Sequence, residues 1–286
     1  MREVTARRTV YDASMRFTFG YAAPEATDAA PKMTELITLV GKKAQADIAV
    51  RVLPSYHHVA QLVHKGELDL AWVSPIPFIA LLRSESVVPL ASPQRGGAHY
   101  HGAILVGADA TIGNLSALVG KRAAWVDRYS AAGFVVPRIE LAKAGLDVKT
   151  AFASQRFLGT HAAVVQAVSD GSADFGATYV RLAPNGAIIS GPWLDKPELE
   201  RKMRIFATFG EIPPDVIVAR QGLDAGVRDR VRGAFLGLAK DMRGLTLSED
   251  VFGADGFFVP NPANYEALRE DAAAAVQDEL LDIPEG

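Results

Sequence analysis

Short apolar runs alternate along the chain with amphipathic segments, which is the pattern of an α/β protein with largely parallel sheets. In the first part of the chain, strands are predicted at residues 16–21, 48–53 and 68–73. Residues 33–40 repeat apolar side chains at helical spacing, and a second helix is predicted between its cap Ser55 and Gly66. Ser74 and Pro75 begin a third helix, because proline loses no needed N–H at the first helical position.

The same alternation continues in the second part of the chain. The predicted strands there are residues 122–126, 151–156 and 173–178. A helix is predicted from Ser130 to Ala144, and Pro137 is expected to kink or restart it. Another helix is predicted from residue 160 to residue 169. Two amphipathic helices are expected to finish the chain.

Two long apolar stretches, residues 98–106 and 203–209, are interpreted as crossings between two lobes. The length of 286 residues is sufficient for two lobes of roughly 100–150 residues each. We therefore expect a discontinuous first lobe, residues 1–105 plus 207–286, and a second lobe of residues 106–206.

Composition narrows the class of protein. Charged residues make up 22% of the chain and the net charge is −3, so no global field favours nucleic acid as a partner. The chain has no cysteine, which excludes disulfides and thiolate metal sites. No window approaches 18 consecutive apolar residues, so no insertion into a membrane is expected. The charged N-terminus lacks the apolar core of a secretion signal, which leaves a cytoplasmic location open.

Four segments carry a resemblance to a known family. The first, residues 65–75, reads Lys-Gly-Glu-Leu-Asp-Leu-Ala-Trp-Val-Ser-Pro; the others are residues 120–137, 159–177 and 256–265. In this order they resemble the substrate-binding proteins of phosphonate and phosphate ABC transporters. The resemblance implies a type 2 periplasmic-binding-protein fold, in which two crossing strands join two α/β lobes and a small anion binds between them. It also implies an extracytoplasmic location and an ABC permease as partner.

The main candidate for anion binding is the segment from Tyr129 to Gly133. A helix N-terminus offers unpaired N–H groups and a partial positive charge, which suit an oxyanion. The segment resembles the family's Ser-Thr-Ser-Gly loop: Ser130 matches the first hydroxyl, whereas Ala131 and Ala132 replace the next two. Phosphonate, phosphate, carboxylate and sulfonate all remain open as ligands. The alternative role for Ser130 is that of a helix cap alone.

Two further helix starts are candidates. His161 matches a family histidine that reaches the ligand, and a neutral imidazole can donate a hydrogen bond to an anion. Ser74 matches the place where the family turns backbone N–H groups toward the cleft. The alternative for both is an ordinary position at a helix start. Trp72, two residues before Ser74, is expected in the core.

Aromatic side chains gather near predicted strand ends. Tyr21, Tyr100, Tyr129 and Tyr179 are expected to contact the ligand, the alternative being ordinary half-buried packing. We expect no metal, because neither pair of histidines, 57–58 or 99 with 101, is accompanied by further convergent ligands. We also expect no cofactor, because no nucleotide-binding motif occurs.

Three functions are compatible with these observations. The motifs favour a solute-binding protein that closes on a small oxyanion for ABC-type uptake. No nucleophile elbow or nucleotide-binding motif is found, so catalysis is not expected. The alternatives are a cytoplasmic enzyme of the same fold, resembling chorismate dehydratase, and a ligand-sensing regulatory module.

Overall fold

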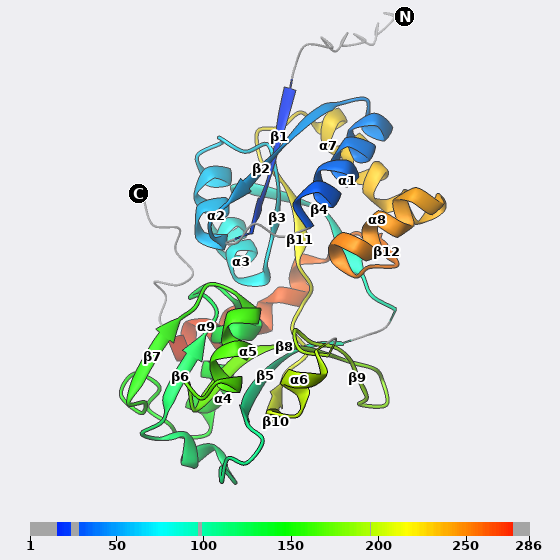
Figure 1. The fold of residues 1–286 in the computed structure, drawn as a ribbon. Helices are drawn as coiled ribbons and strands as arrows, with labels where there is room; N and C mark the ends of the chain where they lie inside the picture. Colours follow the sequence, from blue (N-terminus) through cyan, green and yellow to red (C-terminus); the bar gives the residue numbers. More distant parts are fainter. Residues whose placement is uncertain (1–15, 24–28, 97–98, 195, 277–286) are drawn as a thin grey trace, which may run out of the picture.

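Two β-sheets, one above the other in Figure 1, organise the chain into two lobes. The computed structural model describes residues 16–23, 29–96, 99–194 and 196–276. The charged N-terminal residues discussed above lie outside this part of the chain. The α/β class predicted from the alternating pattern is confirmed, with six strands assigned to each sheet within the described residues.

The first sheet is built from both ends of the chain. In spatial order its strands are β12 (Gly256–Phe258), β4 (Val87–Gln94), β11 (Val216–Arg220), β3 (Leu70–Val73), β1 (Arg16–Ala22) and β2 (Asp47–Leu53). Strand β1 pairs in parallel with β2 and β3, whereas β11 and β12 are antiparallel to their neighbours. The helices of this lobe are α1 (Ala29–Ala44), α2 (Tyr56–His64), α3 (Pro75–Arg83), α7 (Ala225–Leu236) and α8 (Met242–Phe252). Helices α1, α7 and α8 share one core with the sheet, and α2 and α3 cover its other face.

The second sheet repeats this plan. Its strands are β10 (Met203–Phe209), β5 (His99–Gly107), β8 (Phe175–Leu182), β6 (Arg122–Trp125) and β7 (Ser154–Phe157), with β9 (Ile188–Ser190) paired to β8. A π-helical turn (Ala131–Val135) and α4 (Val136–Lys143) cover one face, and α5 (His161–Ser169) and α6 (Pro197–Glu200) cover the other. Strand β6 runs parallel to β7 and β8, so its carboxyl end and that of β7 point the same way.

Local sequence explains where the helices of the second lobe begin. The predicted helix from Ser130 to Ala144 is divided, because the chain makes a π-helical turn and α4 then starts at Val136. Pro137 is the second residue of α4, as expected for a residue that has no N–H to donate within the first turn. The predicted restart at this proline is confirmed.

The positions of the crossings differ from the prediction. Residues 99–107 and 203–209 do not bridge the lobes; they form β5 and β10, which pair antiparallel inside the second sheet. Long apolar runs need hydrogen-bonding partners when they are buried, and an adjacent strand supplies them. The chain instead changes lobes after Gln94, where β4 ends, and between Phe209 and Val216.

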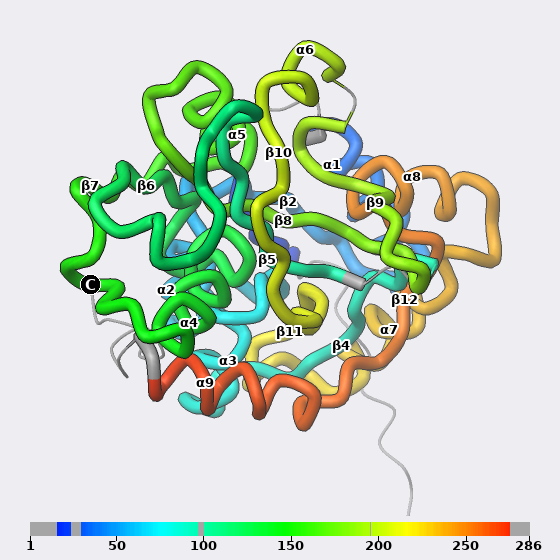
Figure 2. Tube along the Cα trace, turned by 90° about the horizontal axis from the view of Figure 1, so that it is seen from below, coloured from blue at the N-terminus to red at the C-terminus, as the bar shows by residue number. Residues whose placement is uncertain are grey.

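The last helix, α9 (Glu266–Val276), also departs from the expected division of the chain. The sequence placed it in the first lobe, but it packs against α4 of the second lobe, and Lys143 forms an ion pair with Asp271 at 2.9 Å. Figures 1 and 2 both show α9, in red, beside α4. Just before α9, Tyr265 packs edge-on against Phe78 of α3 in the first lobe. The chain therefore passes between the lobes three times.

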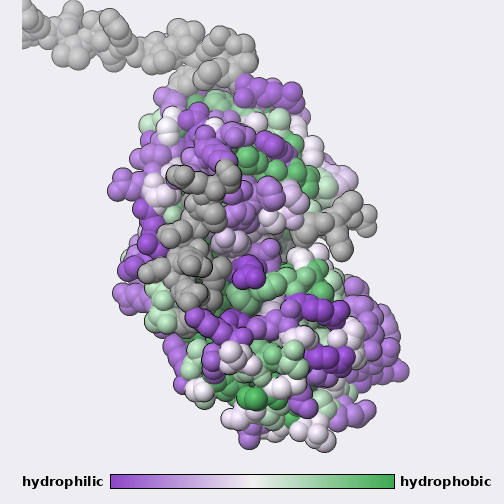
Figure 3. All heavy atoms as spheres, turned by 90° about the vertical axis from the view of Figure 1, so that its left-hand side faces the viewer, coloured by the Kyte–Doolittle hydropathy of each residue, from purple (hydrophilic) through white to green (hydrophobic). Residues whose placement is uncertain are grey.

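The surface is mixed in character. Hydrophilic side chains predominate on the face seen in Figure 3, with smaller groups of hydrophobic ones between them.

No helix within the described ranges combines the length and the apolar composition needed to cross a bilayer.

Candidate ligand-binding site

A cleft of about 400 Å³ lies between the lobes and is lined by residues of both. Four helices begin at its walls: α2 and α3 follow β2 and β3 of the first lobe, and the π-helical turn and α5 follow β6 and β7 of the second. Carboxyl ends of parallel strands direct the following helix N-termini to one edge of the sheet. The first N–H groups of each helix lack partners inside it, and they favour an anion.

Ser130 and Ala131 place the π-helical turn on the cleft wall. Ser130 is 3% exposed, and its Oγ accepts a hydrogen bond from the backbone N–H of Gly133 at 3.0 Å. This cap holds the turn in place, so the capping role foreseen for Ser130 is present together with its position in the cleft. Ala132 is fully buried and is not part of the cleft lining, because its side chain faces the interior of the lobe.

Two hydrogen bonds, one at the start of α5 and one to the ring itself, position His161. Thr160 caps α5 by accepting a hydrogen bond from the N–H of Ala163 at 3.0 Å. The Nδ1 atom of His161 lies 2.9 Å from Oγ1 of the fully buried Thr178. This contact leaves Nε2 as the ring nitrogen available to a ligand. Burial lowers the pKa of His161 from 6.5 to about 4, so the ring is neutral at pH 7.

Ser74 lines the opposite wall. Its Oγ is buried and has no hydrogen-bond partner among the described residues. Prolines at 75 and 77 remove two N–H groups from the first turn of α3, which leaves Ile76 as the donor there. The hydroxyl of Ser74, rather than a row of backbone N–H groups, is therefore the main donor that this helix start offers.

Three tyrosines line the cleft: Tyr100 and Tyr179, which were predicted, and Tyr56, which was not. Tyr179 lies 5.0 Å from His161 and 6.1 Å from Tyr100, measured between ring centroids. Burial, and secondarily the charge of Asp215, raises the pKa of Tyr56 and Tyr100 well above the usual range. Their hydroxyls stay protonated and can donate to an anion. Tyr56 occupies the first position of α2, after the cap Ser55, and a capping residue after a strand was the signal for it.

Two predicted tyrosines lie elsewhere. Tyr21 is 3% exposed and points into the core beside α1, on the same strand face as Phe17 and Phe19, while its neighbour Ala22 lines the cleft. Alternation along a strand requires this arrangement. Tyr129 stacks on His57 with ring centroids 5.0 Å apart, so it connects the second lobe to α2 of the first lobe outside the cleft lining.

Trp72 was expected in the core but lies at its boundary with the cleft. The indole packs edge-on against Phe252 at 4.8 Å, and its buried N–H has no partner in hydrogen-bonding geometry. It is close enough to Asp215 to favour the charged form of that carboxyl group.

Three charged residues at the junction of the lobes were not identified from the sequence. Arg95, just after β4, and Asp215, just before β11, form an ion pair at 3.5 Å with side chains 10% and 20% exposed. Arg181 extends from β8 into the same cleft. Burial raises the pKa of Asp215, and the charges of Arg95 and Arg181 oppose that rise. In the described parts of the chain, no cluster of His, Asp and Glu is placed to hold a metal ion.

Comparisons with known proteins place this architecture in a family. The family described as "ABC transporter, phosphonate, periplasmic substrate-binding protein" matches residues 19–265. PhnD1 from Prochlorococcus marinus, solved with methylphosphonate, is 19% identical, with a TM-score of 0.77 over 92% of this chain and 98% of that one. A binding protein component of an ABC phosphonate transporter from Pseudomonas aeruginosa is 18% identical, with a TM-score of 0.78 over 95% and 90%.

A more distant likeness extends to sulfonate binders. The periplasmic aliphatic sulphonate binding protein SsuA from Escherichia coli is 17% identical, with a TM-score of 0.59 over 94% of this chain and 89% of that one. These likenesses confirm the two-lobed periplasmic-binding-protein fold. Because the family match spans most of the chain, the protein belongs to the periplasmic substrate-binding proteins of phosphonate ABC transporters and is a solute-binding protein.

Proposed function

We propose that the protein captures a small phosphonate, or a closely related oxyanion, in the cleft between its lobes and releases it chemically unchanged to an ABC permease. The observation that carries this proposal is the meeting of four helix N-termini at one cleft, two from each lobe. An anion bound there draws both lobes toward it, because each lobe contributes donors. The family match supports a permease as partner and the periplasm as the compartment.

The phosphonyl group is assigned to the part of the cleft formed by Ser130, Ala131, His161 and Ser74. The Ser74 hydroxyl supports this assignment, since a buried hydroxyl without a partner gains a hydrogen bond when an anion arrives. His161 supports it too, because a neutral ring held through Nδ1 can present Nε2–H to an oxygen atom.

Ser74→Ala separates binding from folding. Calorimetry with methylphosphonate is expected to show affinity weakened about tenfold, because a hydrogen bond to a charged group is lost. Thermal unfolding without ligand is expected to be unchanged, because the hydroxyl has no partner to lose. Ser130→Ala is the matched control: it removes a cap from Gly133, so the stability of the free protein falls as well.

Adding a hydroxyl to the cleft tests the assignment of the phosphonyl group by a gain of affinity, where Ser74→Ala tests it by a loss. Ala131→Ser adds a donor at the cleft wall and is expected to tighten methylphosphonate binding. Ala132→Ser, one residue further on, buries the same hydroxyl away from the cleft and is expected to lower stability without improving affinity. Equal affinities in both variants and the wild type would show that this turn does not touch the ligand.

Phosphorus NMR of the bound ligand over hours tests whether it stays intact. A spectrum that keeps the signal of the added compound supports a binding function. A new phosphorus signal that requires His161 would establish catalysis instead and would favour the enzyme alternative.

A further inference from the structure

The cleft carries an excess of positive charge at the lobe junction. Its charged lining residues in the described chain are Arg95, Arg181 and Asp215, which leaves one positive charge uncompensated. His161 does not change this balance, because its ring is neutral at pH 7. A ligand whose only anionic group lies at the helix N-termini would leave that charge without a counterpart.

Arg95 already has partners in the first lobe. Its Nε donates to the backbone oxygen of Phe252 at 2.9 Å, and its Nη2 lies 3.5 Å from Oδ2 of Asp215. Asp215 is therefore engaged by a guanidinium and is not free to receive a cationic ligand group. An ammonium brought to this place would also meet the second guanidinium, that of Arg181.

Arg181 has far fewer partners. Its Nε is buried without a hydrogen-bond partner, and no described carboxylate forms an ion pair with it. Its guanidinium carbon lies 5.8 Å from the centroid of the Tyr179 ring. Burial, together with the nearby charge of Arg95, lowers the pKa of Arg181. A half-buried guanidinium in this condition favours an incoming anion.

The fold makes room for Arg181 to cross the cleft. Gly253, at the end of α8 in the first lobe, has a φ of 58°, and a Cβ there would lie 2.7 Å from Nη1 of Arg181. The side chain thus reaches from β8 of the second lobe to the first lobe, where the absence of a side chain accommodates it.

The position of Arg181 is separate from the helix N-termini. His161 contacts Thr178 on β8, and Arg181 follows three residues later on the same strand. Three residues of a strand span about 10 Å, and Tyr179 lies between the two positions. The cleft therefore offers donors at two places that one small molecule with two anionic ends can reach together.

We propose that Arg181, assisted by Arg95, binds a second anionic group of the ligand, so that the preferred ligands are small phosphonates bearing a carboxylate a few bonds from phosphorus. This inference rests on the proposed function, because it assigns the phosphonyl group to the helix N-termini. The expected order of affinities follows: carboxyalkylphosphonates bind most tightly, alkylphosphonates of equal length bind more weakly, and aminoalkylphosphonates bind most weakly.

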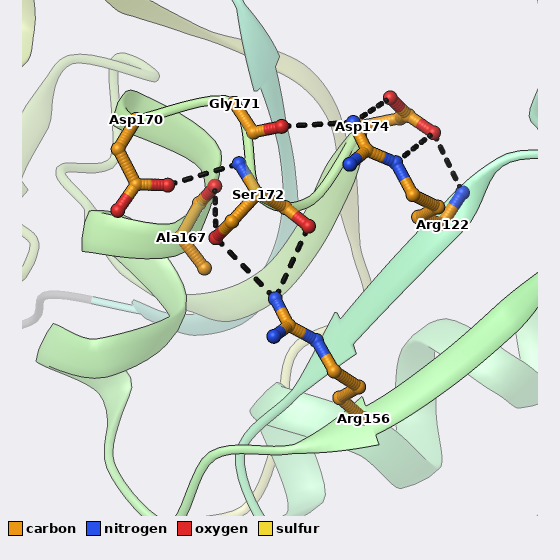
Figure 4. Close-up of polar contacts among 7 residues, drawn as sticks. All are labelled: Arg122, Arg156, Ala167, Asp170, Gly171, Ser172 and Asp174. Carbon is orange, nitrogen blue, oxygen red and sulfur yellow. Dashed lines mark hydrogen bonds and ion pairs between the residues drawn. The ribbon is translucent and has the colours of Figure 1, made fainter.

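Calorimetry with three ligands of matched shape tests this order: carboxyethylphosphonate, propylphosphonate and aminoethylphosphonate. In the wild type, carboxyethylphosphonate is expected to bind at least about tenfold more tightly than propylphosphonate. In Arg181→Gln this preference is expected to disappear, while the affinity for propylphosphonate changes by less than about threefold. Arg156→Gln is the matched control, since Arg156 carries the same charge in the same lobe but bonds to Ser172, away from the cleft (Figure 4).

The outcomes separate the two proposals. If none of the phosphonates binds the wild type, the proposed function itself fails. If propylphosphonate binds as tightly as carboxyethylphosphonate, or if aminoethylphosphonate binds best, the function stands and the second anionic site is wrong. If Arg181→Gln weakens all three ligands equally, Arg181 holds the phosphonyl group and the assignment is overturned. Should Arg181→Gln not fold, Arg181→Met, which keeps the length of the apolar stem, provides the same comparison.

Discussion

Two arginines of the second lobe, Arg122 and Arg181, experience opposite electrostatic conditions. At the start of β6, Arg122 forms an ion pair with Asp174 at 2.7 Å and also donates to the backbone oxygen of Gly171 (Figure 4). There, hydrogen bonds between the partners raise the pKa of Arg122 and lower that of Asp174, so both charged forms are favoured. In the cleft, burial lowers the pKa of Arg181 and raises that of Asp215, so both charged forms are disfavoured.

The difference separates an arginine that stabilises the fold, Arg122, from one that is suited to bind a ligand, Arg181. Arg122 is 48% exposed, and its Nε and Nη2 donate to the carboxylate of Asp174 and to the backbone oxygen of Gly171, so it fixes β6 to the turn before β8. Arg181 is removed from water without receiving a comparable set of partners. Groups held in a condition unfavourable to their charge are typical of binding sites, because the missing interactions are made when a ligand arrives.

The largest expected effect is a pH dependence that belongs to the cleft. The folded pKa of His161, about 4, lies below its ordinary value of 6.5, so the unfolded chain takes up a proton first as the pH falls. The free energy of unfolding should therefore decrease between pH 6.5 and pH 4 by about 1–3 kcal/mol on account of this residue. Urea unfolding of the free protein at several pH values measures the slope.

His161→Gln is the comparison for that slope. The variant loses the contact with Thr178 at every pH, so its absolute stability falls, but the contribution of the imidazole to the slope should vanish. Identical slopes in the two proteins would contradict a neutral, half-buried His161. Added methylphosphonate should flatten the wild-type slope, because a bound anion raises the pKa of the ring.

A smaller effect is expected from two glycines that differ in what surrounds them. Gly253 and Gly171 both have positive φ, 58° and 73°, and both lie beside an arginine. Alanine at either place is expected to lower stability by about 1 kcal/mol through backbone strain. Only Gly253→Ala also displaces Arg181, because open space surrounds Gly171. Carboxyethylphosphonate affinity should fall in Gly253→Ala and stay unchanged in Gly171→Ala.

The smallest effect concerns the two carboxylates and has opposite signs. Asp174 has a lowered pKa, so its charge stabilises the fold above its ordinary pKa, and Asp174→Asn should cost up to about 1 kcal/mol at pH 7. Asp215 has a raised pKa, so its ionised form opposes folding, and Asp215→Asn should leave stability equal or slightly higher. Thermal unfolding of both variants at pH 7 measures the two effects. A larger loss of stability in Asp215→Asn than in Asp174→Asn would show that the pairing of Asp215 with Arg95 outweighs the cost of its burial.

The sequence predicted the parts of the fold that depend on local chemistry. Runs of apolar residues located β1, β2 and β6, the cap Ser55 located α2, and the segment of residues 160–169 was correctly predicted as a helix. Strand β4 was not predicted, because it contains Pro89 and Pro93, which have no N–H to donate to a neighbouring strand. In the structure β4 nevertheless pairs with a strand on each side, and its register shifts along β11. Helix α8 was also missed, since Gly244, Thr246 and Ser248 weaken its helical signal.

The candidate site divides in the same way. Ser74, Ser130 and His161 were identified because each lies at a helix start and matches a position of the family that the sequence resembles, and the structure brings all three to one cleft. Arg95, Arg181 and Asp215 lie on segments far apart in the chain, and only the tertiary fold brings them together. For Arg181 there was a further reason: the predicted strand stopped at Thr178, whereas β8 continues to Leu182 and places Tyr179 and Arg181 on one face.

Helix α9 has a consequence for how the two lobes move. Two connections alone would define an axis about which the lobes rotate freely, but α9 adds a third attachment, anchored on α4 through Lys143 and Asp271 and preceded by Tyr265 on α3. Two lobes that are connected at three places sample a narrower range of relative orientations than two lobes connected at two. Less orientational entropy is then lost when the lobes close, and a small ligand with few contacts can hold them together.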